Sequence, residues 1–197
     1  MSMNPVLIIT GPQPPPFDLY MTDDALVTFG SPAGPGAVSF TDTGFMPVNA
    51  LTIGTSLQEL KGSLDGLFIH YDAIGVQRFA ATGAPTTADY TTLHYELVGY
   101  KGDAVFTHSA DGLPTVSDLK HLTVLAQGDL ISGHLAFAPT GAIAGDVKIS
   151  MQVGGQAVGM LDLSVQHTAG DIGPTGNGFT LSGGMLHAVF VPLSSPT

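Results

Sequence analysis

The stretch Asp129–His167, DLISGHLAFAPTGAIAGDVKISMQVGGQAVGMLDLSVQH, decides the fold class of this chain. From 146 to 153 every second residue is apolar, and the same alternation returns from 157 to 165. Gly154 and Gly155 lie between these two runs, and glycine accepts the positive φ that a tight hairpin turn requires at both central positions. Alternation around a Gly-Gly pair predicts a β-hairpin, and residues 130–138 add a third strand before it.

Similar patterns extend on both sides of this centre. Alternating runs include GLFIHYD at 66–72 and TLHYELVGY at 92–100, and clusters of turn residues separate them. The spacing predicts an all-β fold, either an antiparallel β-sandwich or a β-barrel, with about 10–12 short strands. At most one short helix is expected, and SLQELKG at 56–62 is the best helical candidate.

The chain of 197 residues suits a single β domain over 18–197, preceded by an arm over 1–17. The arm combines an apolar, strand-like run with the proline-rich spacer GPQPPPF, which favours an extended polyproline conformation. The run either joins the domain's own sheet or pairs with a free sheet edge of a neighbouring subunit. Under the second alternative, the residues of self-association are Val6, Leu7, Ile8 and Ile9.

Composition excludes several classes of protein. Hydrophobic residues make up 44% of the chain, which is too many for a disordered protein. There are 16 acidic residues against five Lys and Arg, and the formal net charge is −11. Such a surface repels the phosphates of nucleic acids and of anionic membranes, so neither is expected as a partner.

The sequence contains no cysteine, so it has neither disulfides nor thiolate metal sites. The first 17 residues lack the basic segment of a secretory signal peptide, and no apolar run approaches the ~20 residues that span a bilayer. We therefore expect a cytoplasmic protein, or one that is exported without an N-terminal signal.

Histidine is the one chemically suggestive residue type, with seven copies. His and Tyr both serve as axial ligands of haem iron, and a His-Tyr dipeptide occurs on two predicted strands. Neighbours on a strand point to opposite faces, so one dipeptide cannot supply both ligands to one iron. The candidate ligand-binding residues are His70, Tyr71, His94, Tyr95, His134 and His187.

Other chemistry has weaker support. Asp171 and Asn177 lie in a glycine-rich loop that could hold calcium, although the EF-hand pattern is absent. The sequence also lacks the Gly-x-Ser-x-Gly and His-Glu-x-x-His motifs of common hydrolases. No set of residues in the sequence points to a particular catalytic reaction, so the sequence favours a protein without enzymatic activity.

In its acidity, its glycine content and its lack of cysteine and of an N-terminal signal, the whole chain loosely resembles type I-secreted bacterial proteins such as haemophores. The likeness is one of composition, and no haemophore motif transfers to particular residues. The leading prediction is a structural or interaction protein that self-associates by strand pairing. The alternative is a β-barrel or sandwich that binds a small apolar ligand or haem, and a further alternative is an enzyme of unknown reaction on a barrel.

Overall fold

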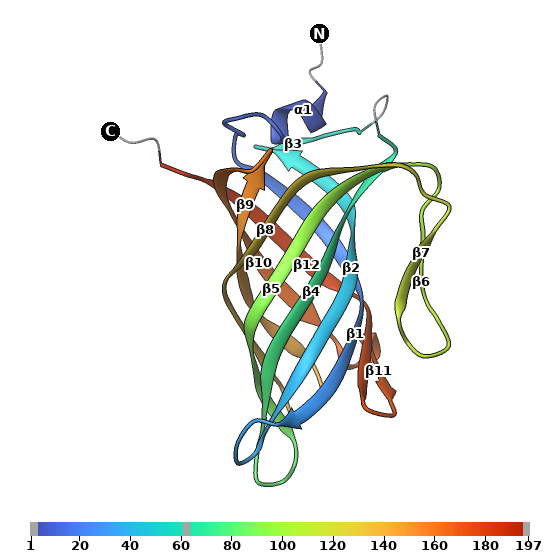
Figure 1. The fold of residues 1–197 in the computed structure, drawn as a ribbon, viewed down its shortest axis with the longest axis vertical. Helices are drawn as coiled ribbons and strands as arrows, with labels where there is room; N and C mark the ends of the chain where they lie inside the picture. The colour runs from blue at the N-terminus through green and yellow to red at the C-terminus, as the bar shows by residue number, and fades with distance from the viewer. Residues whose placement is uncertain (1–3, 61–63, 195–197) are drawn as a thin grey trace.

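The computed structural model describes residues 4–60 and 64–194. They form a closed barrel of eight antiparallel strands with a short helix at one end (Figure 1). The predicted all-β class is therefore confirmed, and of its two forms the chain adopts the barrel.

The barrel has up-and-down topology. Each of its strands pairs with the barrel strand before it and the barrel strand after it, and the last strand pairs with the first to close the ring. The barrel strands are β1 (Phe17–Pro32), β2 (Ala37–Ile53), β4 (Gly66–Phe79), β5 (Pro85–Lys101), β8 (Lys120–Phe137), β9 (Ile143–Val153), β10 (Gln156–His167) and β12 (Gly178–Pro192). The shorter elements are α1 (Pro5–Ile9), β3 (Ser56–Leu57), β6 (Val105–His108), β7 (Pro114–Ser117), the 3-10 helix η1 (Ala169–Asp171) and β11 (Ile172–Thr175).

The structure describes twelve strands, β1 to β12, which agrees with the predicted number, but the eight strands of the barrel are longer than expected. They range from 11 residues in β9 to 18 residues in β8. Shifts of register interrupt the alternation within single strands, for example between Leu130 and Ser132 in β8 and between Ala157 and Gly159 in β10. Each such bulge changes which face the next residues occupy, so a continuous strand looks in the sequence like two short ones.

The hairpin predicted at the centre of the chain is confirmed as β9 and β10. Gly154 and Gly155 form its turn with φ of +57° and +79°. Ile149 lies opposite Leu161 in the register, and both side chains are buried inside the barrel. The alternation in this stretch therefore separates the inner from the outer face of the barrel, as a period of two requires.

Apolar side chains fill the interior of the barrel. The inward positions of every barrel strand contribute to one continuous hydrophobic cluster, which includes the fully buried Leu19, Leu97 and Phe190. Outward positions carry mainly polar residues, such as Lys148 and Asp162 on β9 and β10. The lumen is thus a packed core, as in other barrels of this strand number.

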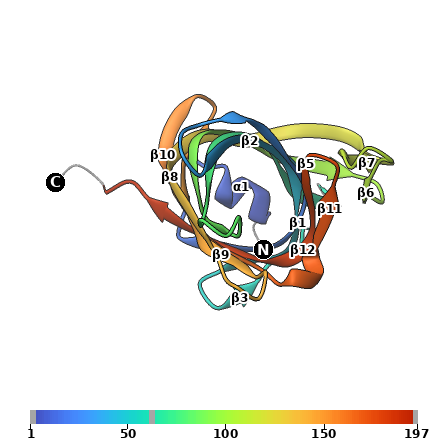
Figure 2. The same cartoon turned by 90° about the horizontal axis from the view of Figure 1, so that it is seen from below.

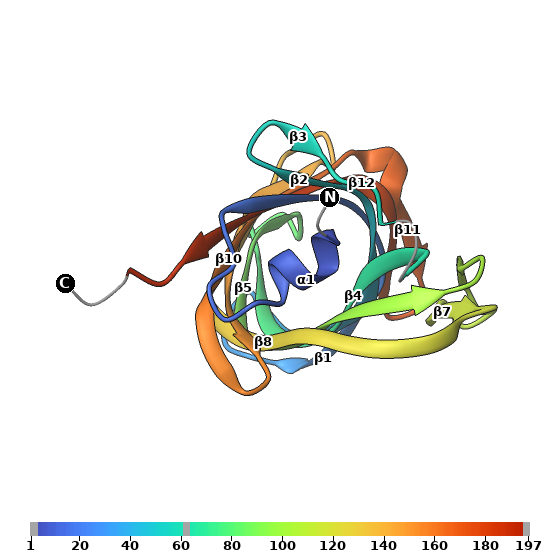
Figure 3. The same cartoon turned by 90° about the horizontal axis from the view of Figure 1, so that it is seen from above.

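The segment predicted as an N-terminal strand is instead the helix α1. It covers one end of the barrel and lies across the opening in both axial views (Figure 2 and Figure 3). Asn4 caps it by accepting a hydrogen bond from the Val6 backbone at 3.0 Å, and Pro5 occupies the first turn. Asn at the cap followed by Pro is a helix-start signal, and it prevails here over the strand preference of the β-branched residues. Val6 and Ile9 are buried in the core cluster, whereas Leu7 is 71% exposed.

The helix predicted over 56–62 is wrong where it can be compared. Ser56 and Leu57 form β3, which pairs with the end of β2, and residues 58–60 have no regular structure. The rest of the predicted helix, residues 61 and 62, lies outside the described residues. None of the helices that the structure describes is long and apolar enough to cross a membrane.

The long connection between β5 and β8 forms a separate hairpin of β6 and β7 on the side of the barrel (Figure 1). Phe106 of this hairpin packs against Phe45 and Phe68 on the outer wall, with ring centroids 6.0 and 5.6 Å apart. His108 Nε2 lies 3.2 Å from the carbonyl oxygen of Ala25. The hairpin therefore covers an aromatic patch that the outer wall would otherwise expose.

Deleting residues 1–16 should lower the melting temperature without changing the oligomeric state in solution. Burial of Val6 and Ile9 is worth roughly 3–6 kcal/mol together, and the entropy of ordering the helix offsets much of it. We expect a net loss of about 2 kcal/mol, or roughly 4–8 °C for a domain of this size. Calorimetry with light scattering would measure both quantities, and Leu7→Ser should leave both nearly unchanged. Loss of an oligomer with an unchanged melting temperature would instead support the self-association prediction.

Candidate functional site

A cluster of polar side chains lies inside the otherwise apolar barrel. It consists of Asp23 on β1, Asp42 on β2, Tyr71 on β4, Tyr90 on β5 and His167 on β10. Strand alternation places them inward, because each occupies the same face as buried apolar residues of its own strand. The two aspartates and the histidine are at most 3% exposed.

Hydrogen bonds join both aspartates through one tyrosine. Tyr71 Oη lies 3.2 Å from Asp23 Oδ1 and 3.1 Å from Asp42 Oδ1. Tyr90 Oη donates to Asp42 Oδ2 at 2.7 Å. A phenol has a single proton, so Tyr71 can satisfy both contacts only if it donates to one carboxylate and accepts from a protonated one. The geometry therefore fits one shared proton on the pair of aspartates.

Burial determines where that proton resides. The pKa of Asp42 is raised to about 7. Removal of the carboxylate from water is the largest cause and the nearby Asp23 adds to it, while the two tyrosine hydroxyls and His167 act in the opposite direction. Burial also raises the pKa values of Tyr71 and Tyr90 well above 10, so both remain phenols at neutral pH. Near neutral pH the cluster can therefore hold or release one proton at Asp42.

The imidazole of His167 lies beside Asp23 and packs closely against the backbone of Gly184. Its Nε2 lies 3.4 Å from Asp23 Oδ2, and neither ring nitrogen has a hydrogen-bond partner among the described residues. A Cβ on Gly184 would lie 2.5 Å from Nδ1 of the imidazole, and Gly184 has a φ of +74°. Only glycine combines that conformation with that clearance.

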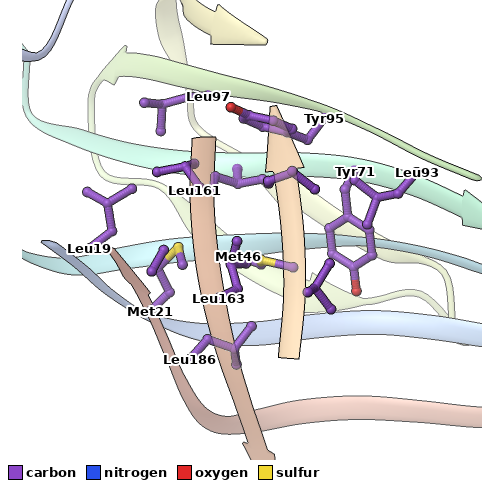
Figure 4. Close-up of a cluster of buried hydrophobic side chains, with 14 of the residues drawn as sticks. Leu19, Met21, Met46, Tyr71, Leu93, Tyr95, Leu97, Leu161, Leu163 and Leu186 are labelled. Carbon is purple, nitrogen blue, oxygen red and sulfur yellow. The ribbon is translucent and has the colours of Figure 1, made fainter. Parts of the chain in front are cut away.

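A cavity of about 30 Å³ adjoins the cluster. By the measure of roughly 10–15 Å³ for one water, it has space for about two water-sized groups. Its wall is aliphatic except for Asp23, Tyr71, Tyr90, Tyr95 and His167. Figure 4 shows two of these tyrosines, Tyr71 and Tyr95, among the surrounding aliphatic side chains. A second cavity of about 20 Å³ lies against Asp42 and Tyr90 and is lined further by Gln77 and phenylalanines.

Tyr95 Oη is buried and has no hydrogen-bond partner within the described chain. A buried hydroxyl without a partner costs roughly 1–3 kcal/mol. The Tyr95 side chain also forms part of the cavity wall. The wall thus combines one carboxyl group, three tyrosine rings and an imidazole around one small space.

The structure divides the candidate ligand-binding residues between the two faces of the barrel. Tyr71 and Tyr95 lie in the lumen, as part of the cavity wall. The four histidines of the set lie on the outer wall, as the opposite orientation of strand neighbours requires. They are His70, which stacks on Phe45, His94, which is 3.0 Å from Asp129, His134, which is 2.6 Å from Asp89, and His187, which is 3.4 Å from Asp18.

Sequence reasoning missed Asp23, Asp42, Tyr90 and His167 as members of a site. Their signal was a polar residue in the inward phase of an apolar alternation, such as Asp23 between Met21 and Ala25. Such a residue can be recognised as buried only when the inner face of each strand is known.

The structure gives the cofactor candidates little support. A cavity of about 30 Å³ is far smaller than the roughly 300–1,000 Å³ of typical pockets for drug-sized ligands, so a haem does not fit the closed interior. Asp171 accepts hydrogen bonds from the Thr168 backbone and hydroxyl at 2.7 and 2.9 Å, and Asn177 donates to the Phe29 carbonyl at 2.7 Å. In the described ranges no group of three or more His, Asp or Glu side chains could hold a metal ion.

Comparison with protein-family models, with curated proteins and with solved structures gives no match to this chain. The class of protein is therefore defined by its own architecture. It is a closed, up-and-down antiparallel barrel with a helix at one end and a buried acidic and phenolic cluster inside.

Proposed function

We propose that this barrel binds a molecule of a few heavy atoms in its lumen, with the polar part of the molecule near Asp23 and the tyrosines of the cavity wall. The observation that carries the proposal is the cavity whose wall includes Tyr95, a residue whose buried hydroxyl has no hydrogen-bond partner among the described residues. An apolar cavity with a few convergent polar groups and a shifted pKa is the general form of a binding site. Binding of a small apolar ligand is also one of the two main alternatives that the sequence leaves open.

The size of the cavity limits the ligand. Space for about two water-sized groups admits two or three heavy atoms without movement of the walls. Small ligands gain at most about 1.5 kcal/mol per heavy atom, so a molecule of three atoms binds with a dissociation constant no tighter than about 0.5 mM.

NMR titration of tyrosine-labelled protein tests this proposal. The probes are ethanol, acetonitrile, formate and ethylammonium, which have three heavy atoms each. At least one of them should shift the Tyr71 or Tyr95 ring signals saturably. Val165→Leu adds a methylene group to the cavity wall and should abolish the shift.

Val158→Leu is the matched control, because Val158 is as deeply buried on the same strand but lies outside the cavity wall. It should bind the same probe as the unaltered protein does. If none of the four probes produces a saturable shift, or if both valine variants behave alike, lumen binding is refuted.

Self-association remains a prediction with less support. Closure of the ring pairs both sides of every barrel strand, so the barrel itself offers no free edge to an incoming strand. Two of the four candidate residues, Val6 and Ile9, are buried within their own subunit.

A further inference from the structure

We infer that a hollow on the outer wall of the barrel binds a neutral sugar. The hollow has a volume of about 460 Å³ and is lined by residues of β1, β2, β10 and β12, among them Tyr20, and we call it the Tyr20 hollow. Sites for small molecules typically measure roughly 300–1,000 Å³, so its size suits a sugar ring, which the lumen cavity of about 30 Å³ does not. This second site goes beyond the proposed lumen binding and does not depend on it.

The Tyr20 hollow lies at a β-bulge of the wall. The register between β1 and β12 shifts between Met21 and Asp23, opposite Gly183 and Gly184. Both glycines have positive φ, of +101° and +74°. Gly184 lines the hollow and has no side chain to fill it. The backbone itself therefore shapes this part of the wall, and bulges of this kind are frequent beside binding sites.

Five polar side chains line the Tyr20 hollow without a hydrogen-bond partner among the residues that the structure describes. They are Tyr20, Thr22, Asn49, Ser164 and Gln166. Hydroxyl groups and primary amides both donate and accept hydrogen bonds. The hydroxyl groups of a sugar do the same, so each of them can pair with this lining in either direction.

Two other hollows of similar size differ in this respect. One, of about 480 Å³, contains Asp72 and His94, which already interact with Thr43 at 2.6 Å and with Asp129 at 3.0 Å. The other, of about 510 Å³, contains Asp65, which accepts a backbone hydrogen bond at 2.8 Å. Their polar side chains serve contacts within the protein, whereas those of the Tyr20 hollow are available to a ligand.

The charge of the Tyr20 hollow favours a neutral ligand. Its described lining contains no Asp, Glu, Lys or Arg, although the chain has 16 acidic residues. An anionic ligand would meet no Lys or Arg there and would be repelled by the formal net charge of −11. A cationic ligand would meet no carboxylate in the lining.

Exposed apolar surface accompanies these polar groups. Tyr20 is 42% exposed and Met185 is 70% exposed, and both line the hollow. The Tyr20 ring stacks on His187, with ring centroids 4.5 Å apart and an angle of 9° between the planes. This stacking orients the tyrosine before binding, and a tyrosine offers contact area at a low cost in conformational entropy. A sugar carries C–H groups as well as hydroxyl groups, so it can use both kinds of surface.

His187 thereby gains a role that differs from metal ligation. The sequence singles it out as a candidate ligand-binding residue, and it lines the Tyr20 hollow. Its contact with the Tyr20 ring makes it a positioning residue for the sugar site.

The test titrates methyl β-glucoside, methyl β-galactoside and methyl α-mannoside into protein labelled at tyrosine rings and methionine methyl groups. At least one hexoside should shift the NMR signals of the Tyr20 ring and the Met185 methyl group saturably, with one dissociation constant. The signals of Tyr71 and Tyr95 in the lumen should stay in place. The uronate that corresponds to the bound hexoside should bind several-fold more weakly, because it adds a negative charge.

Three variants assign the binding to residues. Gln166→Ala removes hydrogen bonds and should weaken the hexoside roughly two- to tenfold. Gln152→Ala is its matched control, because Gln152 lies on the neighbouring strand β9 outside the hollow, and it should change nothing. Tyr20→Ala should abolish the shift of the Met185 methyl signal, whereas Tyr20→Phe keeps the apolar ring and should retain binding. Circular dichroism melts verify that each variant is folded.

The outcomes are distinct from those of lumen binding. If none of the three hexosides shifts the Tyr20 and Met185 signals saturably, the sugar site is refuted, whatever the lumen binds. Equal affinity of Gln166→Ala and Gln152→Ala for the hexoside would place the sugar elsewhere and overturn the inference. A uronate that binds as tightly as its neutral hexoside would refute the selection of a neutral ligand.

Discussion

Ile149→Asp should prevent the barrel from folding. Ile149 is 2% exposed, faces the lumen from β9 and lies opposite Leu161 on β10. The substitution removes an apolar side chain worth roughly 1.5–3 kcal/mol and buries a carboxylate without a cationic partner, which costs several kcal/mol more. Because domains are stable by only about 5–15 kcal/mol, the sum consumes most or all of the stability. Leu161→Asp should have the same result.

Circular dichroism melts measure this effect, and Lys148→Ser is the matched control. Lys148 directly precedes Ile149 on β9 and points outward, where its Nζ pairs with Asp162 at 2.9 Å. Surface ion pairs contribute about 0–1 kcal/mol, so this control should melt within a few degrees of the unaltered protein. A cooperative melt of Ile149→Asp at the same temperature would contradict the inward orientation of this face.

The fold was predictable where local chemistry determines it. In the β9–β10 hairpin, the period of two and the Gly154–Gly155 pair specify two strands and their turn before any tertiary contact forms. The choice between sandwich and barrel was not predictable. It depends on the pairing of β1 with β12, such as Asp18 with Val189, which are separated by nearly the whole chain and carry no local signal.

The candidate site was less predictable than the fold, for the same reason. Asp23, Asp42 and His167 lie on three different strands, and only closure of the ring brings their side chains into one interior. The sequence could place Tyr71 and Tyr95 on the face opposite to their histidine neighbours, but not decide which face was inside. The chemistry of histidine suggested a ligand-binding role, but the histidines of the candidate set lie on the outer wall beside aspartates or aromatic rings.

The N-terminal segment shows a conflict between two local signals. The run Val6–Ile9 is rich in β-branched residues, which favour strands, while Asn4 and Pro5 favour the start of a helix. The open end of the barrel resolves the conflict, because a closed ring offers no edge for a strand but does offer an apolar end that a helix can cover.

Asp42→Asn should stabilise the protein at pH 8 and flatten its stability between pH 4 and pH 7. In the unfolded chain Asp42 ionises with the ordinary aspartate pKa of 3.8, and in the folded chain its pKa is raised to about 7 by burial. Between these values the unfolded state loses a proton that the folded state keeps, so stability falls as pH rises. A difference of about three pH units corresponds to about 4 kcal/mol, which is reached near pH 7 and stays constant above it.

Asparagine has no proton to lose, so the variant lacks this penalty. At pH 4 it should be no more stable than the unaltered protein, because a neutral carboxyl group satisfies Tyr71 and Tyr90 at least as well as an amide does. At pH 8 it should be more stable by up to about 4 kcal/mol. Urea denaturation from pH 4 to pH 8 measures the difference directly, and Asp72→Asn on the outer wall should follow the curve of the unaltered protein. Parallel curves for Asp42→Asn and the unaltered protein would show that Asp42 is ionised in the folded barrel throughout this range, and that the aspartates do not share a proton.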